Sequence, residues 1–277
     1  MSKTVILVCA HKQDECLAEP PYMPIQVGKA ISGVDLGFTG DNTGDNISAR
    51  NRNFCELTAH YWAWKNLKGA DYIGLCHYRR YFDFGSDTCN VVTAPTRQFF
   101  SSPHPVPDFD RLFSRYDMMM SKPKPYAYNL YRDYSRCHRQ EDIDTLREIV
   151  QELYPDYVES FDHVFFHNNM LSHFNMFVMP WLRFEEYSKW LFDILFEAER
   201  RIEIPSDPVQ ARIFGYMSER LMSVYARRNG LIVKYQTVTM VTDDKKKGLA
   251  SYMFHSVMNN MLYAITRPFY RNKPKTR

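Results

Sequence analysis

Hydrophobic and polar positions change their period within residues 56–84, and this change predicts a helix followed by a buried strand. Apolar residues recur at helical spacing from Leu57 to Leu67. Residues 72–76 form a short apolar run that contains an aromatic residue and an isoleucine, which is typical of a strand. Gly69 lies between the two patterns, and we expect it to make the tight turn that joins them.

The rest of the chain alternates between strand and helix patterns. Residues 4–10 are nearly all apolar and suit a central strand of a parallel sheet. Further strands are expected within residues 115–125 and at 175–179, and helices are expected within residues 141–167, 181–202 and 208–228. This alternation predicts an α/β fold with a mostly parallel central sheet flanked by helices and a helical C-terminal part.

Two stretches are rich in turn-forming residues and are expected to be irregular. The first follows His11 and Lys12 and extends to about residue 53, with many prolines, glycines and asparagines. A loop of that length in a compact domain is usually functional, and Asn46 offers it a polar group suited to hydroxyl-rich ligands. Asparagine is also an ordinary turn residue. The second stretch, residues 85–110, reads as a surface excursion.

The predicted strand 72–76 runs directly into four residues that include three basic side chains: His77, Tyr78, Arg79 and Arg80. Cations at the end of a buried strand are costly unless an anion, a carboxylate or solvent meets them. In open α/β sheets that end is also where ligands bind. We therefore predict an anionic substrate, the diphosphate of a nucleotide sugar. The alternative is that both arginines form ion pairs that stabilise the fold.

Composition narrows the class of protein. The chain has 277 residues, 45% of them hydrophobic and 15% aromatic, which excludes a disordered chain. No run approaches the roughly 20 apolar residues of a spanning helix, and the N-terminal residues do not resemble a signal peptide, so we expect a cytoplasmic protein. The six cysteines show no zinc-type spacing, and we expect no metal or catalytic thiol among them.

Charge is distributed unevenly along the chain. Residues 226–277 hold eleven Lys or Arg against two Asp, whereas residues 1–225 hold 35 − 11 = 24 basic against 32 − 2 = 30 acidic residues. The last stretch mixes large apolar residues with basic ones, which suits a helix lying on an anionic membrane surface. A C-terminal helix docked on the body is the alternative. We expect no nucleic-acid binding, because no nucleic-acid fold motif is recognisable.

Seven segments together resemble one known family, the bacterial capsular and exopolysaccharide glycosyltransferases whose shared domain was long catalogued as one of unknown function. They span nearly the whole chain: AHK (10–12), TGDNIS (43–48), ELTAHYWAWKN (56–66), YIGLCHYRRYF (72–82), FNMFVM (174–179), EEYSKWLFDILFE (185–197) and FGYMSERL (214–221). The resemblance implies a GT-A-like domain over residues 1–240, followed by a basic amphipathic segment over 241–277.

The resemblance also implies an activity. A hexosyltransferase of this kind moves a sugar from a nucleotide donor, UDP-linked in our expectation, to a lipid-linked capsular, O-antigen or exopolysaccharide acceptor. Some relatives resemble galactofuranosyltransferases. Such an enzyme would be peripheral at the inner face of the plasma membrane. The alternatives are a non-catalytic nucleotide-sugar or glycan binding protein of an assembly complex, and an adaptor that binds through its cationic tail.

Donor binding is expected to use cations in place of a metal. Many GT-A enzymes hold a metal with Asp-x-Asp at the end of a central strand, and this sequence has His-Tyr-Arg-Arg there. We therefore expect guanidinium groups to contact the diphosphate, with no metal and no further cofactor. The DFD motif at 108–110 is the alternative source of metal ligands. The residues assigned to donor binding are His11, Lys12, Asn46, His77, Arg79, Arg80 and Asn175, the last by likeness to the FNxG strand of glycogenin-like transferases.

Catalysis and acceptor binding need two further kinds of side chain. The candidate bases for the acceptor hydroxyl are Glu219 and Asp83, with His173 behind them. The alternative for Glu219 is an ion pair with Arg220 or Arg212 on a helix face. Aromatic faces for an acceptor sugar are assigned to Tyr78, Tyr81 and Phe82, and core packing is the alternative for such rings.

Overall fold

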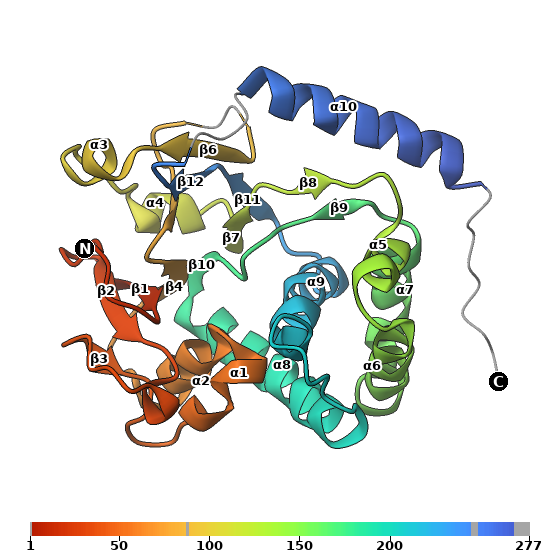
Figure 1. Ribbon diagram of the computed structural model, residues 1–277, viewed down its shortest axis with the longest axis horizontal. Coiled ribbons are helices and arrows are strands. Elements are labelled where there is room, and N and C mark those ends of the chain that lie inside the picture. Colours follow the sequence, from red (N-terminus) through yellow and green to blue (C-terminus); the bar gives the residue numbers. More distant parts are fainter. Residues whose placement is uncertain (1, 87–88, 245–248, 269–277) are drawn as a thin grey trace.

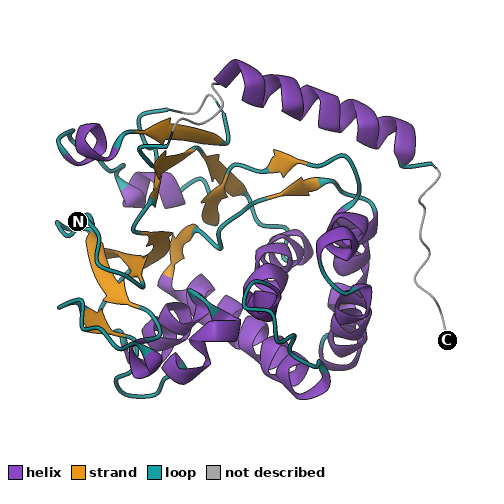
Figure 2. Ribbon diagram, in the orientation of Figure 1, coloured by secondary structure: helices purple, strands orange, loops and turns teal. Residues whose placement is uncertain are grey.

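A mixed β-sheet lies at the centre of the fold (Figures 1 and 2). The computed structural model describes residues 2–86, 89–244 and 249–268. The main path of the sheet has the strand order β11-β7-β10-β4-β1-β2-β3, and β12 pairs with β5 and β6 beside it. Its strands are β1 (Thr4–Ala10), β2 (Tyr22–Gln26), β3 (Thr39–Gly40), β4 (Tyr72–His77), β5 (Arg80–Phe82), β6 (Val91–Ala94), β7 (Met118–Ser121), β10 (Phe177–Pro180), β11 (Val233–Gln236) and β12 (Val238–Val241).

The sheet is mostly parallel along its main path, as the sequence predicts. β1 pairs parallel with both β2 and β4, and β11 pairs parallel with β7. β10 is antiparallel to β4 and β7. A separate two-stranded ribbon joins β8 (Lys124–Pro125) to β9 (Met170–Leu171). The prediction of a mostly parallel sheet flanked by helices is confirmed.

Helices cover one face of the sheet, and further helices pack beside them (Figure 1). They are α1 (Asn51–Phe54), α2 (Leu57–Asn66), α5 (Leu130–Cys137), α6 (Gln140–Leu153), α7 (Val158–Phe166), α8 (Trp181–Arg201) and α9 (Ile213–Arg228). Toward the other face lie α3 (Thr96–Phe100) and α4 (Phe109–Phe113), and α10 (Leu249–Thr266) runs along the β8–β9 ribbon. Short 3-10 turns occupy Lys29–Ile31, Ser48–Arg50, Pro155–Tyr157 and Gln210–Arg212.

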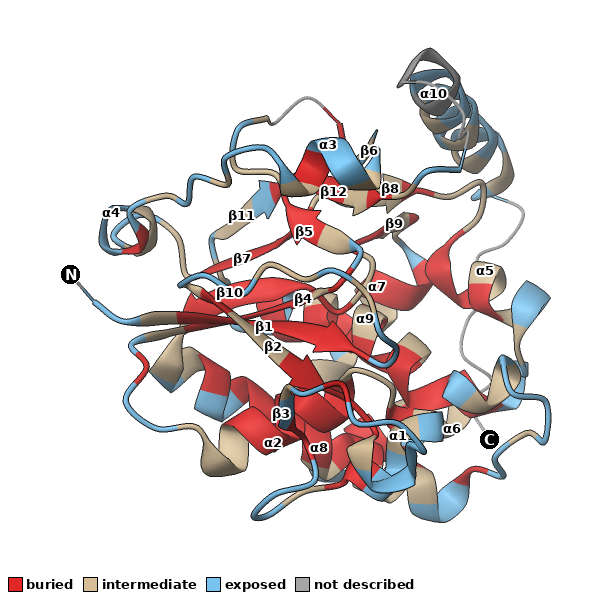
Figure 3. Ribbon diagram, turned by 60° about the vertical axis from the view of Figure 1, so that its left-hand side comes forward, coloured by how far each residue is buried: buried red, intermediate tan, exposed pale blue. Residues whose placement is uncertain are grey.

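β1 separates two hydrophobic cores because its side chains alternate between the faces of the sheet. Val5, Leu7 and Cys9 belong to the larger core beneath the helices. Ile6, Val8 and Ala10 belong to the smaller core beneath β5, β12, α3 and α4. All six side chains are buried, as Figure 3 shows for the central strands, so the expectation of a central strand buried on both faces is confirmed.

The segment with the change of period folds as predicted. α2 ends at Asn66, β4 begins at Tyr72, and Gly69 between them has a φ of 72°. A positive φ is costly for residues with a Cβ and costs glycine little. The long helix predicted over residues 181–202 is α8, which ends at Arg201. Of the stretch 208–228, the α-helix begins only at Ile213.

Two expectations about irregular segments and one about the end of the strand before Arg79 need correction. The proline-rich stretch after Lys12 contains β2, which pairs with β1 over five residues. Prolines are tolerated there because β2 lies near the sheet edge, where its outer neighbour β3 pairs with only two of its residues. Residues 85–110 contain β6 and α3. Arg80 is the first residue of β5, which turns back antiparallel onto β4 through the pair His77–Arg80. Arg79 therefore lies in the hairpin turn and Arg80 in the returning strand.

Gly74 in β4 gives a test of how tightly the sheet packs against its neighbours. A Cβ at Gly74 would lie 2.9 Å from Val178 Cγ2 and 3.0 Å from the Phe177 carbonyl oxygen. We expect Gly74→Ala to lower the free energy of unfolding by about 1–3 kcal/mol, because overpacking forces its neighbours to move. Gly33→Ala is the control, because nothing lies within 4 Å of that Cβ position. Urea unfolding measures both variants, and equal stability would contradict the packing described here.

The basic segment 241–277 is only partly described. Residues 245–248 and 269–277 lie outside the described residues, and α10 accounts for most of the remainder. Within the described ranges, every helix is too short or too polar to pass through a bilayer.

Candidate functional site

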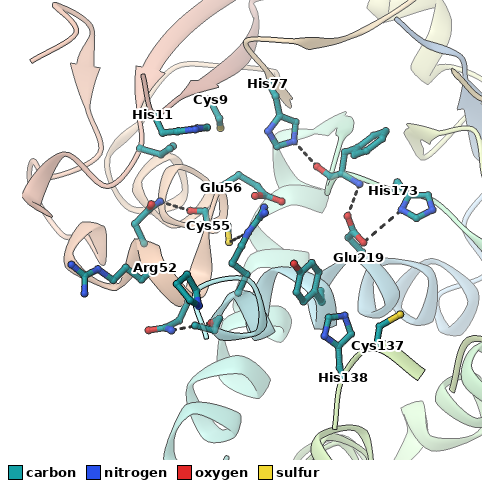
Figure 4. A pocket seen from close by; sticks show the side chains of 18 of the residues that line it. Cys9, His11, Arg52, Cys55, Glu56, His77, Cys137, His138, His173 and Glu219 are labelled. Carbon is teal, nitrogen blue, oxygen red and sulfur yellow. Dashed lines mark hydrogen bonds and ion pairs between the residues drawn. The ribbon is translucent and has the colours of Figure 1, made fainter. Parts of the chain in front are cut away.

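A cavity of about 1090 Å³ opens where β1 and β4 end, between the sheet and α1, α5 and α9 (Figure 4). Carboxyl ends of parallel strands are the usual place for ligands in α/β folds. Both strands contribute lining residues, including Cys9, His11 and His77. Four of the residues assigned to donor binding therefore meet in it: His11, His77, Arg79 and Arg80. The cavity also receives Glu219 and Tyr78.

The two adjacent arginines have different environments. Arg79 forms an ion pair with Asp14, with its Nη2 2.7 Å from Oδ2 and its Nε donating to the same oxygen. Arg80 lies with its guanidinium 4.8 Å from the centre of the Phe174 ring, and its buried Nε has no hydrogen-bond partner. Burial lowers the pKa of Arg80 from its ordinary value, although the charge of Glu56 opposes this effect. The ion-pair alternative thus describes Arg79, whereas Arg80 lines the cavity and has a nitrogen without a partner.

The backbone beside the cavity is held in an unusual conformation. Phe174 and Asn175 have φ values of 76° and 51°, which residues with a Cβ rarely adopt. Three side chains hold them there: Glu219 accepts a hydrogen bond from Phe174 N–H at 2.7 Å, His77 Nε2 donates to the Phe174 carbonyl at 2.7 Å, and Glu56 Oε1 accepts from Asn175 Nδ2 at 2.7 Å. Such backbone strain clusters at functional sites.

Glu219 is the carboxylate whose surroundings favour proton exchange. Burial raises its pKa from 4.5 to about 7, although Arg220 and the Phe174 N–H counteract this effect. Its Oε2 lies 3.8 Å from His173 Nδ1 (Figure 4). Burial lowers the pKa of His173 to about 3, so the histidine is neutral and this contact is not an ion pair. The hydroxyl of Tyr126 shares a hydrogen bond with His173 Nε2 at 2.9 Å.

The positive charge of the cavity comes from arginines. Burial lowers the pKa of His11 and of His77, which leaves both neutral near pH 7. Arg220 of α9 and Arg212 of the turn before α9 line the cavity together with Arg80. The sequence interpretation treated these two only as partners of Glu219. Both arginines act on Glu219 by their charge, and each also has other contacts. Arg212 Nε donates to Cys55 Sγ, and Arg220 donates to the Tyr216 carbonyl and lies 3.8 Å from Asp133.

A signal for this face was present in the sequence. Arg212, Tyr216, Glu219 and Arg220 are spaced by four, three and one residues, which places them on one side of a helix. All four line the cavity. Glu56 also lines it and was missed, because a glutamate just before a helix is indistinguishable from an ordinary surface residue in the sequence.

The structure places several assigned polar residues away from the cavity lining. Asp83 lies beyond β5, where its N–H donates to the Thr237 carbonyl and its Oδ1 accepts from Gly85 N–H. Asn46 lies in a turn, donates to the Gly44 carbonyl and lines a separate hollow. Lys12 is exposed, 5.9 Å from the centre of the Tyr78 ring. Asn175 is only 2% exposed and reaches the cavity through its bond to Glu56.

Of the three aromatic residues assigned to acceptor binding, one lines the cavity and two do not. Tyr78 lines the cavity, with its ring at right angles to the ring of His11, although it is only 9% exposed and also belongs to the smaller core. Tyr81 is 1% exposed and Phe82 is 5% exposed, and both pack in the smaller core. The Tyr81 hydroxyl donates to the Tyr78 carbonyl. Neither ring offers a face to a sugar, so their assignment to acceptor binding is corrected here to core packing.

The other possible ligands for a metal are dispersed. Asp108 caps α4 by accepting from Arg111 N–H, and Asp110 accepts from the Tyr72 hydroxyl. The DFD motif at 108–110 is not among the residues that line the cavity. Across residues 2–86, 89–244 and 249–268, no three His, Cys, Asp or Glu side chains are arranged to hold a metal ion. Burial raises the pKa of Cys55 to about 12, so this cavity cysteine is a thiol and a poor nucleophile.

Comparison with known proteins places the chain in a family. The family model described as a domain of unknown function, DUF4422, matches residues 5–230. No curated protein matches the sequence significantly. Among solved structures, the apo structure of WbbM, a bifunctional glycosyltransferase, is similar with a TM-score of 0.76 and 31% identity, covering 89% of this chain and 46% of that one. The chain thus spans about half the length of WbbM. The fold is that of a GT-A-like glycosyltransferase, and by the extent of the family match the chain belongs to the DUF4422 family.

Proposed function

We propose that the chain is a glycosyltransferase that moves a hexose from a UDP-linked donor to a lipid-linked capsular, O-antigen or exopolysaccharide acceptor. The observation that carries this proposal is the meeting of two groups in one cavity. They are Arg80, whose buried Nε has no hydrogen-bond partner, and Glu219, a carboxyl whose pKa burial raises to about 7. Inverting sugar transfer from a diphosphate donor, carried out without a metal, uses both kinds of group. The similarity to WbbM supports the same reaction class.

The donor side is assigned to the arginines. A departing nucleoside diphosphate gains negative charge, and donors placed in advance around it lower the barrier. Arg80 is the principal contact in this proposal, with Arg212 and Arg220 adding positive charge to the same cavity. A guanidinium binds phosphate oxygens through two parallel N–H groups. A cavity of about 1090 Å³ is large enough for a nucleotide sugar.

The acceptor side is assigned to Glu219. In a transfer that inverts the anomeric centre, the acceptor hydroxyl gives its proton to the carboxylate while its oxygen bonds to the anomeric carbon. The bond from that carbon to the diphosphate oxygen breaks, and its electron pair leaves with the diphosphate. A pKa of about 7 keeps a large fraction of Glu219 ionised at neutral pH and makes it an effective base. We assign contact with the acceptor to Tyr78, which lines the same cavity.

Thermal shift with nucleotide sugars tests the proposal. We expect a UDP-sugar at about 100 times its Kd to add roughly 2.7 kcal/mol of stability and to raise the Tm by several degrees, in chelator as well as with manganese. UDP-galactofuranose is the first donor to test, with UDP-galactopyranose and UDP-glucose beside it. The result that contradicts the proposal is an unchanged Tm with every nucleotide sugar. Binding without hydrolysis or transfer would instead favour a non-catalytic binding protein.

A further inference from the structure

The C-terminal helix α10 docks on the body by its polar side. Asn259 Nδ2 donates to the Pro125 carbonyl at 3.0 Å, and Thr266 Oγ1 donates to the Ala127 carbonyl at 3.3 Å. Asn260 Oδ1 accepts from Asn169 Nδ2 at 3.1 Å. The half-buried positions of the helix recur at helical spacing and are mostly polar: Ser256, Asn259, Tyr263 and Thr266. The side of α10 that faces the body is therefore polar, as the solvent-exposed side of an ordinary surface helix would be.

The outward side of α10 is apolar, the reverse of an ordinary surface helix. Seven large apolar side chains there are 37–63% exposed: Met253, Phe254, Val257, Met258, Met261, Leu262 and Ile265. Figure 3 shows the helix standing out from the body with mostly exposed positions. Scattered exposed apolar residues are normal, whereas a continuous apolar stripe marks an interaction surface. Something of apolar character is expected to cover this face.

We propose that the outward face of α10 inserts into the interface of an anionic lipid bilayer. Charge selects the lipid surface over a second copy of the chain. Residues 245–277 contain eight Lys or Arg and no Asp or Glu. All eight flank α10, which itself contains no Lys, Arg, Asp or Glu. Two copies paired along α10 would bring these basic flanks together and repel each other, whereas anionic lipid head groups complement the charge. At 1.5 Å per residue, the eighteen residues of α10 make a helix of about 27 Å. A helix of this length can lie parallel to the bilayer surface with its apolar stripe toward the lipid.

This placement connects the membrane to the cavity. α10 bonds to the carbonyl oxygens of Pro125 and Ala127, which flank Tyr126, and Tyr126 lines the cavity. Asn169 donates both to Asn260 and to the Tyr126 carbonyl. A helix fixed on lipid would therefore hold this side of the cavity near the bilayer, where a lipid-linked acceptor is confined. The inference concerns α10 alone and stands whether or not the cavity transfers a sugar.

Vesicle flotation with the full chain tests the inference. We expect the protein to float with vesicles of phosphatidylcholine mixed with phosphatidylglycerol, to float poorly with phosphatidylcholine alone, and to dissociate as salt is raised. Phe254→Ser combined with Ile265→Ser is expected to weaken binding at least about tenfold, since two large apolar side chains leave the interface. Leu182→Ser combined with Val209→Ser removes two equally exposed apolar side chains elsewhere and serves as the control.

A spectroscopic measurement makes the test specific to the face. Phe254→Trp is expected to be quenched by lipids brominated on their acyl chains, and Leu182→Trp is not. The inference is overturned by wild-type protein that stays unbound, by α10 variants that float as well as wild type, or by equal binding to neutral vesicles. It is also overturned by a concentration-dependent dimer that the α10 variants dissociate without any vesicle binding, since a second copy would then cover the face.

Discussion

Arg80→Ala is expected to lower kcat/KM for sugar transfer by about 10²–10³-fold, whereas Arg79→Ala changes it by less than about fivefold. The two side chains are neighbours in sequence, but of these two only Arg80 has a buried nitrogen without a partner, as Arg220 across the cavity lining also has. Arg79 already pairs with Asp14, and its side chain is 46% exposed. A diphosphate would have to displace that carboxylate to use Arg79 fully. Initial rates over a range of donor concentrations measure both variants.

Stability measurements separate this result from a folding defect. An exposed ion pair such as Arg79–Asp14 contributes about 0.2–1 kcal/mol, so Arg79→Ala should unfold at nearly the wild-type Tm. Arg80→Ala removes a buried cation and should also remain folded, while losing the thermal shift caused by a UDP-sugar. Arg80→Lys keeps the charge without the two parallel donors and should recover only part of the activity. Equal losses in the two alanine variants would contradict the division of roles between Arg79 and Arg80.

The sequence predicts the elements that carry their own signal. β1 and β4 are recognisable as nearly continuous apolar runs, and α2 and α8 are recognisable from the helical spacing of their apolar residues. β2 is not recognisable, because Pro20 and Pro21 precede it, Pro24 lies within it, and its strand character depends on pairing with β1. β5 has only three residues and exists through its partners β4 and β12. Short strands of this kind are determined by tertiary pairing more than by local propensity.

The candidate site, too, could be predicted only in part from the sequence. A strand that ends in basic residues indicates an anion site, but the sequence cannot tell that the hairpin after β4 sends Arg79 to Asp14 and leaves Arg80 at the cavity. Tyr78 and Tyr81 look alike in the sequence and both belong to the smaller core, yet only Tyr78 also lines the cavity. The direction in which each side chain points follows from the turn. In α10 the amphipathic pattern was visible, while the side that faces the body was not.

Glu219→Gln is expected to lower kcat by about 10²–10⁴-fold without destabilising the protein, because the amide removes the base but can still accept the hydrogen bond from Phe174 N–H. In wild type, kcat/KM should rise as the pH increases through about 7, where the carboxyl loses its proton. The glutamine variant should lose this step. Rates measured across the pH range from about 5 to about 9 test both statements, and Glu185→Gln, at an exposed position on α8, is the control.

Stability should change with pH in the direction set by the raised pKa of Glu219. The pKa is about 7 in the folded chain against 4.5 when unperturbed, so the folded state binds more protons between these values. Wild-type stability therefore loses up to about 3 kcal/mol as the pH rises from about 4.5 to about 7, and the loss remains above that pH. Glu219→Gln lacks this loss, so it should match wild type near pH 4 and exceed it near pH 8. A variant that is inactive and also less stable near pH 8 would indicate that Glu219 supports the fold rather than the proton transfer.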